Sequence, residues 1–367
     1  MPLVSHAARP QVTNGAHVPR RLWIVLAAAA ALVGVVGGYL WWQRDDRTSF
    51  AWAVGHAPAG AQRLSWTDWE AIREHEGVRL TGRSSPAELQ HFLDAAYDDD
   101  LSSTSALVTS AAALQKRFGF SPASADWELF SQSEQGAVVM LHLPSSVDLD
   151  DVADHLRALG YREPGEDDGV WEGGEDLVAS ISASLSGELQ YLALDRDDSL
   201  VLTSDSSSYL GVALDAVRGD GARATGLDRV VDDAGEPLSS AVYDGGYACG
   251  ALAMAHAGAA DQAQAERLLA AAGEVSPFSA FAMSDEPQGT VRVAFEFADD
   301  AAARANADTR ATLARGPAPG QGGTFGDRFR VASVTARGTL VVMLLEPRPG
   351  ASVLSDLSTG PVLFATC

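Results

Sequence analysis

Histidine and carboxylate side chains are the residues of this chain best suited to acid–base or metal chemistry, yet their spacing forms no known motif. Beyond residue 43 the histidines are His56, His75, His91, His142, His155 and His256. None has the H-E-x-x-H spacing of a zinc protease. His155 follows Asp151 by four residues, so both would lie on one helix face, where surface electrostatics explains the pair as well as a general base does. We therefore predict no catalytic residue and no metal ligand.

Acidic side chains gather in short runs along the chain. The runs are Asp98–Asp100, Asp148–Asp151, Glu166–Asp168, Asp195–Asp198 and Asp232–Asp233. None completes a calcium loop with its glycine and closing glutamate. A helix start explains the second run and a hairpin turn the fourth, because Asp is favoured at both positions. We predict no cofactor, and weak calcium binding stays open.

Nucleophile motifs are also missing from the sequence. It contains neither a G-x-S-x-G elbow nor a Walker loop, and Gly320–Gly323 lies in a Pro/Gly loop without the strand-then-helix context of a phosphate cradle. Lys116 is the only lysine, so a lysine-based mechanism has a single candidate. Serines are abundant, and a Ser/His/Asp trio assembled in space is neither indicated nor excluded.

The two cysteines, Cys249 and Cys367, are candidates for a disulfide. In an oxidising compartment, two cysteines with no other choice tend to pair. In the chain-entropy model, closing a loop of about 100 residues contributes roughly 4–5 kcal/mol. Two buried free thiols and an intermolecular link are the alternatives. A zinc site is a poor explanation, because zinc sites use closely spaced ligand pairs.

Residues 22–42 form an uncharged stretch that predicts a transmembrane helix. At about 1.5 Å per residue they span a hydrocarbon core of about 30 Å. Trp23 lies at one end and Tyr39, Trp41 and Trp42 lie at the other, as in helices with rings at both interfaces. Arg20–Arg21 precede the stretch, which favours a cytoplasmic tail at 1–21 and an extracytoplasmic remainder. The chain is thus expected in the cell membrane, crossing it once and contacting lipid through residues 22–42.

The rival interpretation of this stretch is a cleaved signal peptide, whose apolar region is usually only about 7–15 residues long. We prefer an uncleaved anchor because the apolar run is longer. Gly34 and Gly38 form a small-xxx-small pair within it, and this spacing allows two helices to approach closely. These two glycines are the candidate contact of a homodimer, although Gly is common in such helices.

The charge of the chain restricts its partners. Residues 1–43 hold three of the 26 bases and no acid, so the remainder carries 23 bases against 49 acids, a formal charge of −26. Such a surface repels phosphate backbones, and we predict no nucleic-acid binding. It suits cations or basic protein partners, although plain solubility of an exported domain explains the same charge.

The elements that would position these residues predict an α+β fold. Residues 43–64 have no clear period and are interpreted as a tether. Residues 65–126 are interpreted as a helical segment, with a capping box at Thr67 and Glu70 and another at Ser85 and Glu88. From residue 127 onward, short apolar runs separated by turn residues alternate with amphipathic helices.

The order of these elements, two strands then a helix, twice over, occurs in residues 127–220 and again in residues 277–367. We therefore predict two similar ββα…ββα sandwich-like units with mostly antiparallel sheets, joined by a connecting region at 221–276. Shared identities are few, so chance remains the rival explanation of this internal repeat. For function, we expect a membrane-anchored, non-enzymatic module for binding, envelope assembly or sensing. The alternative is an exported hydrolase with a spatially assembled site.

Overall fold

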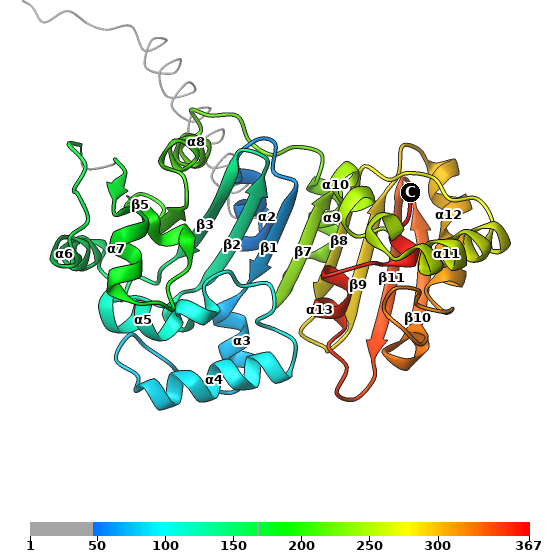
Figure 1. Cartoon of the computed structure of the whole chain (residues 1–367), viewed down its shortest axis with the longest axis horizontal. Helices are drawn as coiled ribbons and strands as arrows, with labels where there is room; N and C mark the ends of the chain where they lie inside the picture. The colour runs from blue at the N-terminus through cyan, green and yellow to red at the C-terminus, as the bar shows by residue number, and fades with distance from the viewer. Residues whose placement is uncertain (1–46, 167–168) are drawn as a thin grey trace, which may run out of the picture. The chain divides into compact units, whose positions relative to one another are not determined.

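The computed structural model describes residues 47–166 and 169–367. Within them, eleven strands form one sheet in the order β10-β11-β9-β8-β7-β1-β2-β3-β6-β5-β4, and every neighbouring pair is antiparallel. Figure 1 shows the first half of this sheet in blue to green and the second in yellow-green to red. The predicted α+β class with mostly antiparallel pairing is confirmed. The strands form one continuous sheet, however, instead of two separate sandwiches.

The strands are β1 (Arg63–Thr67), β2 (Trp127–Ser133), β3 (Gly136–His142), β4 (Trp171–Glu172), β5 (Tyr191–Asp195), β6 (Leu200–Ser204), β7 (Ser239–Asp244), β8 (Ala280–Asp285), β9 (Val291–Glu296), β10 (Phe329–Arg337) and β11 (Leu340–Pro347). The helices are α2 (Ser49–His56), α3 (Trp69–His75), α4 (Pro86–Asp98), α5 (Ala111–Arg117), α6 (Leu149–Leu159), α7 (Gly174–Ile181), α8 (Ser207–Arg218), α9 (Asp228–Ala234), α10 (Gly245–Ala251), α11 (Ala259–Ala272), α12 (Asp300–Leu313) and α13 (Val353–Ser358).

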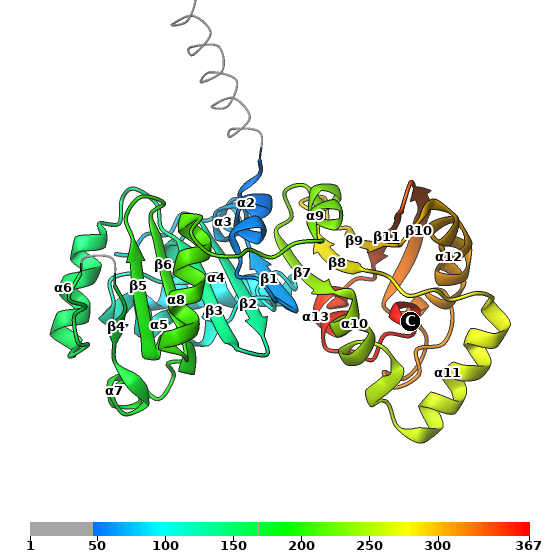
Figure 2. The ribbon, with the colours of Figure 1, turned by 90° about the horizontal axis from the view of Figure 1, so that it is seen from above.

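Helices cover both faces of the sheet and create three apolar clusters. One cluster packs α2, α8 and α9 on the face to which Trp66 and Val242 point. On the other face, α3 to α7 cover the first half and α10 to α13 cover the second half. Figure 2 shows α2 and α9 on one side of the sheet and α10 and α13 on the other. Alternate residues of each strand therefore enter different clusters, as the period of two requires.

The centre of the sheet is the pairing of β1 with β7, where the two halves meet. Leu64 lies opposite Val242, and Ser65 lies opposite Ala241. To one side the strand order is β1-β2-β3-β6-β5, and to the other it is β7-β8-β9-β11-β10. The last hairpin of each half thus joins the sheet through its second strand. In the first half β6 pairs with β3, and in the second half β11 pairs with β9.

Three assignments made from the sequence differ from the structure. Part of the expected tether at 43–64 is ordered: residues 49–56 form α2, whose Phe50 is 1% exposed, and residue 63 begins the central strand β1. Residues 65–67 also belong to β1, and Asp68 caps the following helix in place of Thr67. The stretch 221–276, assigned to a connection, contains the other central strand, β7. β1 alternates polar and apolar residues over only five positions and β7 does not alternate, and both are central only because partner strands lie on each side of them.

Other local predictions are confirmed. Ser85 and Glu88 form the capping box of α4, with Pro86 at the first helical position. Helix α6 begins after Asp148 and ends at Gly160, which has a φ of 98°. A residue with a side chain would be strained in this left-handed conformation, which is why glycine ends so many helices.

The expected membrane segment at 22–42, with Gly34 and Gly38, lies outside the described residues. Among the residues that are described, no helix is both long enough and apolar enough to cross a membrane.

The chain end is fixed to the second half by a disulfide and by a buried arginine. Cys249 and Cys367 are bonded, with their Cα atoms 5.6 Å apart, so the predicted pairing is confirmed. The Arg310 guanidinium donates to the carbonyl oxygens of Phe364 at 2.5 Å, Thr366 at 3.0 Å and Ser276 at 2.7 Å. Its carbon also lies 4.9 Å from the centroid of the Phe295 ring. Burial lowers the pKa of Arg310 to about 9, which leaves the group protonated at neutral pH.

Candidate functional site

A pocket of about 340 Å³ lies where the two halves of the sheet meet, and we call it the junction pocket. Segments from both halves line it: the end of α4, the turn between β8 and β9, and the loop that leads from β11 to α13. Its acidic lining residues are Asp98, Asp99, Asp100, Asp285 and Glu286. His75 and Arg348 are the basic groups in the lining. The pocket therefore combines residues that are far apart in the sequence and is strongly acidic.

The end of α4 positions the first of these acids. Asp98 is the last helical residue and Asp99 is the C-cap. Asp100 has a φ of 62°, a left-handed conformation that Asp adopts more readily than most residues. This conformation turns the chain away from the helix axis. Asp100 is consequently 8% exposed although it belongs to an acidic run.

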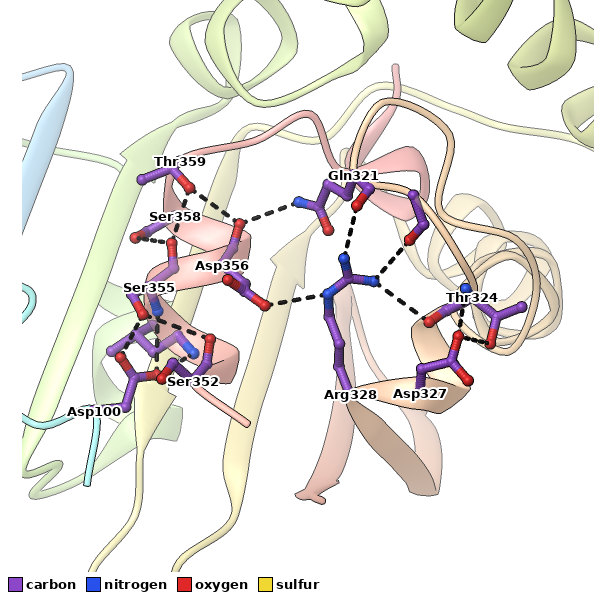
Figure 3. A network of polar contacts seen from close by, with 12 residues as sticks. Asp100, Gln321, Thr324, Asp327, Arg328, Ser352, Ser355, Asp356, Ser358 and Thr359 are labelled. Atoms are coloured by element: carbon purple, nitrogen blue, oxygen red, sulfur yellow. Dashed lines mark hydrogen bonds and ion pairs between the residues drawn. The ribbon is translucent and has the colours of Figure 1, made fainter. Parts of the chain in front are cut away.

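Asp100 binds the start of α13 in the other half of the chain. Its Oδ2 accepts the backbone amides of Leu354 at 2.7 Å and Ser355 at 3.2 Å, and its Oδ1 accepts the Ser355 hydroxyl at 2.6 Å. Figure 3 shows these contacts at the first turn of the helix. Burial raises the pKa of Asp100, and these hydrogen bonds oppose the rise. Asp100 thus supplies the cap that the N-cap residue Ser352 does not provide.

Asp285 closes the inner side of the pocket. It ends β8 and lies opposite Ser239 of β7, whose hydroxyl donates to Asp285 Oδ2 at 3.1 Å. Burial raises the pKa of Asp285 well above its usual range, and the neighbouring Asp100 raises it further. Two carboxylates that cannot both be charged without cost make this pocket favourable for a cation.

A second network holds α13 against the loop that precedes β10. The Arg328 side chain donates to Asp356 Oδ2 at 3.1 Å and to the Gln321 carbonyl oxygen at 2.9 Å. The Gln321 amide donates to the Asp356 carbonyl oxygen at 3.1 Å. These residues lie beside the Asp100 contacts in Figure 3. The Gly320–Gly323 stretch, interpreted from the sequence as a plain loop, is therefore braced by the partly buried side chain of Arg328.

A smaller groove of about 270 Å³ has Glu236 and Pro237 in its lining, next in sequence to Leu238 of the junction pocket. It is lined by Asp68, Glu70, Glu74 and Glu236, together with Phe50 and Trp66. Asp68 caps α3 by accepting the Ala71 amide at 2.9 Å. Burial raises the pKa of Asp68 to about 6. The segment that leads into β7 thus lines two acidic grooves.

The pair His155 and Asp151, noted in the sequence, lines a third groove of about 670 Å³ beside α6. Both side chains are exposed. The His155 ring packs on Gly119, where a Cβ would come within 2.8 Å of the ring. This close approach explains a glycine at position 119, which has a φ of 82°. A hydrogen bond between His155 and Asp151 is absent from this described part of the chain.

Sequence reasoning missed two carboxylate contacts. His142 Nδ1 lies 2.9 Å from Asp126 Oδ2, and the His142 ring stacks on Trp127. No hydroxyl of the described residues hydrogen-bonds to this imidazole. Glu128 is fully buried and accepts hydrogen bonds from Ser105 and Trp69, while burial raises its pKa. The alternation of polar and apolar residues in 126–129 was a signal for Asp126 and Glu128 that the sequence offered.

Comparisons with known proteins identify no family. No family model matches the chain, and no curated protein matches it. Crystal form I of TP0453 is similar over 85% of this chain and 97% of that chain, with 8% identity and a TM-score of 0.40. Crystal form III of TP0453 is similar over 83% and 97%, with 7% identity and a TM-score of 0.41. Similarities of this size carry no conclusion about function.

Proposed function

We propose that this protein is a membrane-anchored, extracytoplasmic and non-enzymatic binding module that holds a positively charged segment of a partner protein in the junction pocket. The observation that carries this proposal is the set of carboxylates that both halves contribute to that pocket, with Asp285 at its inner side. A basic side chain entering the pocket would relieve the repulsion between Asp285 and Asp100.

The anchor part of the proposal rests on the sequence of residues 22–42 and the preceding Arg20–Arg21. In this arrangement the described residues lie outside the membrane, and Gly34 with Gly38 supports a homodimer within it. Protease treatment of intact cells tests the orientation. The region after residue 43 should be digested, and full protection of that region would contradict the orientation.

The binding role is tested with the full-length chain in detergent micelles and a fluorescent peptide rich in Arg and Lys. Fluorescence anisotropy should report binding that weakens about tenfold, or about 1.4 kcal/mol, in the variant Asp98→Asn/Asp285→Asn, because it removes the exposed charge of Asp98 and the charge that Asp285 would gain beside a bound cation. The matched control Glu266→Gln/Asp308→Asn removes two exposed charges that do not line the pocket. An equal loss of affinity in both variants would show that net charge alone explains the effect. That result would contradict the assignment of the binding site to the junction pocket.

An exported hydrolase is the second candidate, and one observation favours it. The contact between Asp126 and His142 has the form of the two non-nucleophilic members of a Ser/His/Asp triad. If a hydrolytic site exists here, His142→Ala should abolish ester hydrolysis by the purified protein. Hydrolysis that is absent from the wild-type chain, or unchanged in the variant, would remove this candidate.

We also propose that residues 127–220 and 277–367 derive from an internal duplication. The equivalent strand order on the two sides of the β1–β7 pair supports this proposal. The central strands extend each unit toward its N-terminus, to residues 63 and 239. A superposition of the two units through their strands tests it, and unrelated paths of α6 and α12 over the sheet would contradict it.

A further inference from the structure

One imidazole and two carboxylates come together beside the junction pocket. The side chains are His75, Glu76 and Asp99, and their ligand atoms all lie within 4.8 Å of one another. His75 Nε2 is 3.9 Å from Asp99 Oδ2. His75 and Asp99 also line the junction pocket. The group is thus a set of three metal-ligating side chains from two helices, next to an accessible cavity.

Two helix ends converge at this cluster. His75 is the last residue of α3 and Glu76 is its C-cap, while Asp99 is the C-cap of α4. The carbonyl groups at a helix C-terminus carry partial negative charge, which favours a cation. The last turn of α4 has no basic residue. Arg73 in the last turn of α3 donates instead to the carbonyl oxygens of Ala123 and Ala125. Both negative helix ends therefore add to the charge of the carboxylates.

Glu76 provides an independent sign of a missing ligand. Its Oε1 atom is shielded from solvent without a hydrogen-bond donor among the described residues, while the carboxylate as a whole is partly buried and lies next to that of Asp99. A polar atom that is shielded from water and lacks a partner is unfavourable, and more so when it is charged. Native structures rarely tolerate such an atom unless something else satisfies it. A metal ion between Glu76, His75 and Asp99 would do so.

We propose that His75, Glu76 and Asp99 bind one divalent transition-metal ion of the zinc type. A nitrogen ligand with two carboxylate oxygens suits zinc, whereas calcium and magnesium prefer oxygen ligands alone. Three protein ligands leave a fourth coordination position open for water or another ligand. The side chains of His75 and Asp99 are 36% and 59% exposed, so both can rotate to the shorter ligand distances of about 2 Å. This site does not depend on the binding role proposed above, because it requires His75 and Glu76.

The test measures zinc binding by the full-length chain in detergent. The protein is produced without a polyhistidine tag and is freed of metal before the measurement. Isothermal titration at pH 7 should find one Zn²⁺ per chain. His75→Ala and Asp99→Asn should each weaken binding at least about tenfold. The control His155→Ala removes an exposed histidine outside the cluster and should leave the affinity unchanged.

Cobalt substitution supplies a second readout that does not depend on stability. Co²⁺ bound by one nitrogen and two oxygens in a four-coordinate site should give visible absorption, which His75→Ala should abolish while its folding, checked by circular dichroism, is retained. Absence of stoichiometric zinc binding, or affinity and spectra unaffected by His75→Ala, would overturn the proposal. The cationic peptide is measured on the metal-free protein, so the two proposals can fail separately.

Discussion

The Ser355 hydroxyl donates a hydrogen bond to Asp100 at 2.6 Å, although 255 positions separate the two residues in the chain. The same carboxylate accepts the amide of Leu354, so it caps α13 from the opposite half of the sheet. Together with the β1–β7 ladder and the hydrogen bond from Trp66 Nε1 to the Pro237 carbonyl oxygen, this contact joins the two halves. It also fixes one wall of the junction pocket.

Asp100→Ala should destabilise the protein by about 2–3 kcal/mol, because it removes the cap of α13 and forces Ala into a left-handed conformation. Asp100→Asn is the matched variant, since Asn tolerates that conformation and keeps one acceptor oxygen. It should cost about 1 kcal/mol. Chemical denaturation of both variants checks the order. Equal losses of stability in Asp100→Ala and Asp100→Asn would contradict separate contributions from the backbone conformation and from the carboxylate.

Arg310→Met should lower the free energy of unfolding by about 3 kcal/mol. The substitution fills the space but leaves the carbonyl oxygens of Ser276, Phe364 and Thr366 without their donor. Arg304→Met on the same helix is the control, because Arg304 is 67% exposed. Its effect should stay within about 0.5 kcal/mol. A thermal-unfolding series that ranks the two variants equally would contradict the role assigned to Arg310.

Removal of the disulfide should also destabilise the second half. Replacing Cys249 and Cys367 by Ser opens a loop with a sequence separation of 118, for which the chain-entropy model gives about 4–5 kcal/mol. Mass spectrometry under non-reducing conditions first verifies the linked peptide in the wild-type chain. Denaturation of the Ser variant then measures the loss, and a midpoint equal to that of the oxidised protein would show that the bond adds no stability.

Asp68 should make stability depend on pH in a defined direction. Burial raises its pKa to about 6 from 3.8, so the folded protein holds this proton more tightly than the unfolded chain. The resulting stabilisation is complete below about pH 3.8 and is lost as the pH rises through 6.

Asp68→Asn keeps a good N-cap without the charge. Relative to the wild type it should gain about 1–2 kcal/mol between pH 4 and 7, a value reduced for partial exposure. The difference between the two unfolding curves isolates this group from other carboxylates. A difference that does not change with pH would mean that Asp68 has an ordinary pKa.

Local patterns were sufficient for the parts of the fold that depend on neighbours in sequence. The capping box at Ser85 and the helix start at Asp148 follow from backbone hydrogen bonding within one turn, so these two helix starts were predicted correctly. The pairing of Cys249 with Cys367 was the only intramolecular choice the composition offered. The antiparallel class followed from short strands separated by tight turns.

The tertiary structure alone decided how the halves join and where the candidate sites lie. Strands β1 and β7 have only five and six residues, and their place at the centre of the sheet depends on partner strands from both halves. The capping of α13 by Asp100, and the approach of His75 to Asp99, depend on how separate helices pack against one sheet. These contacts form because apolar faces from the whole chain are buried together. No short stretch of sequence contains that information.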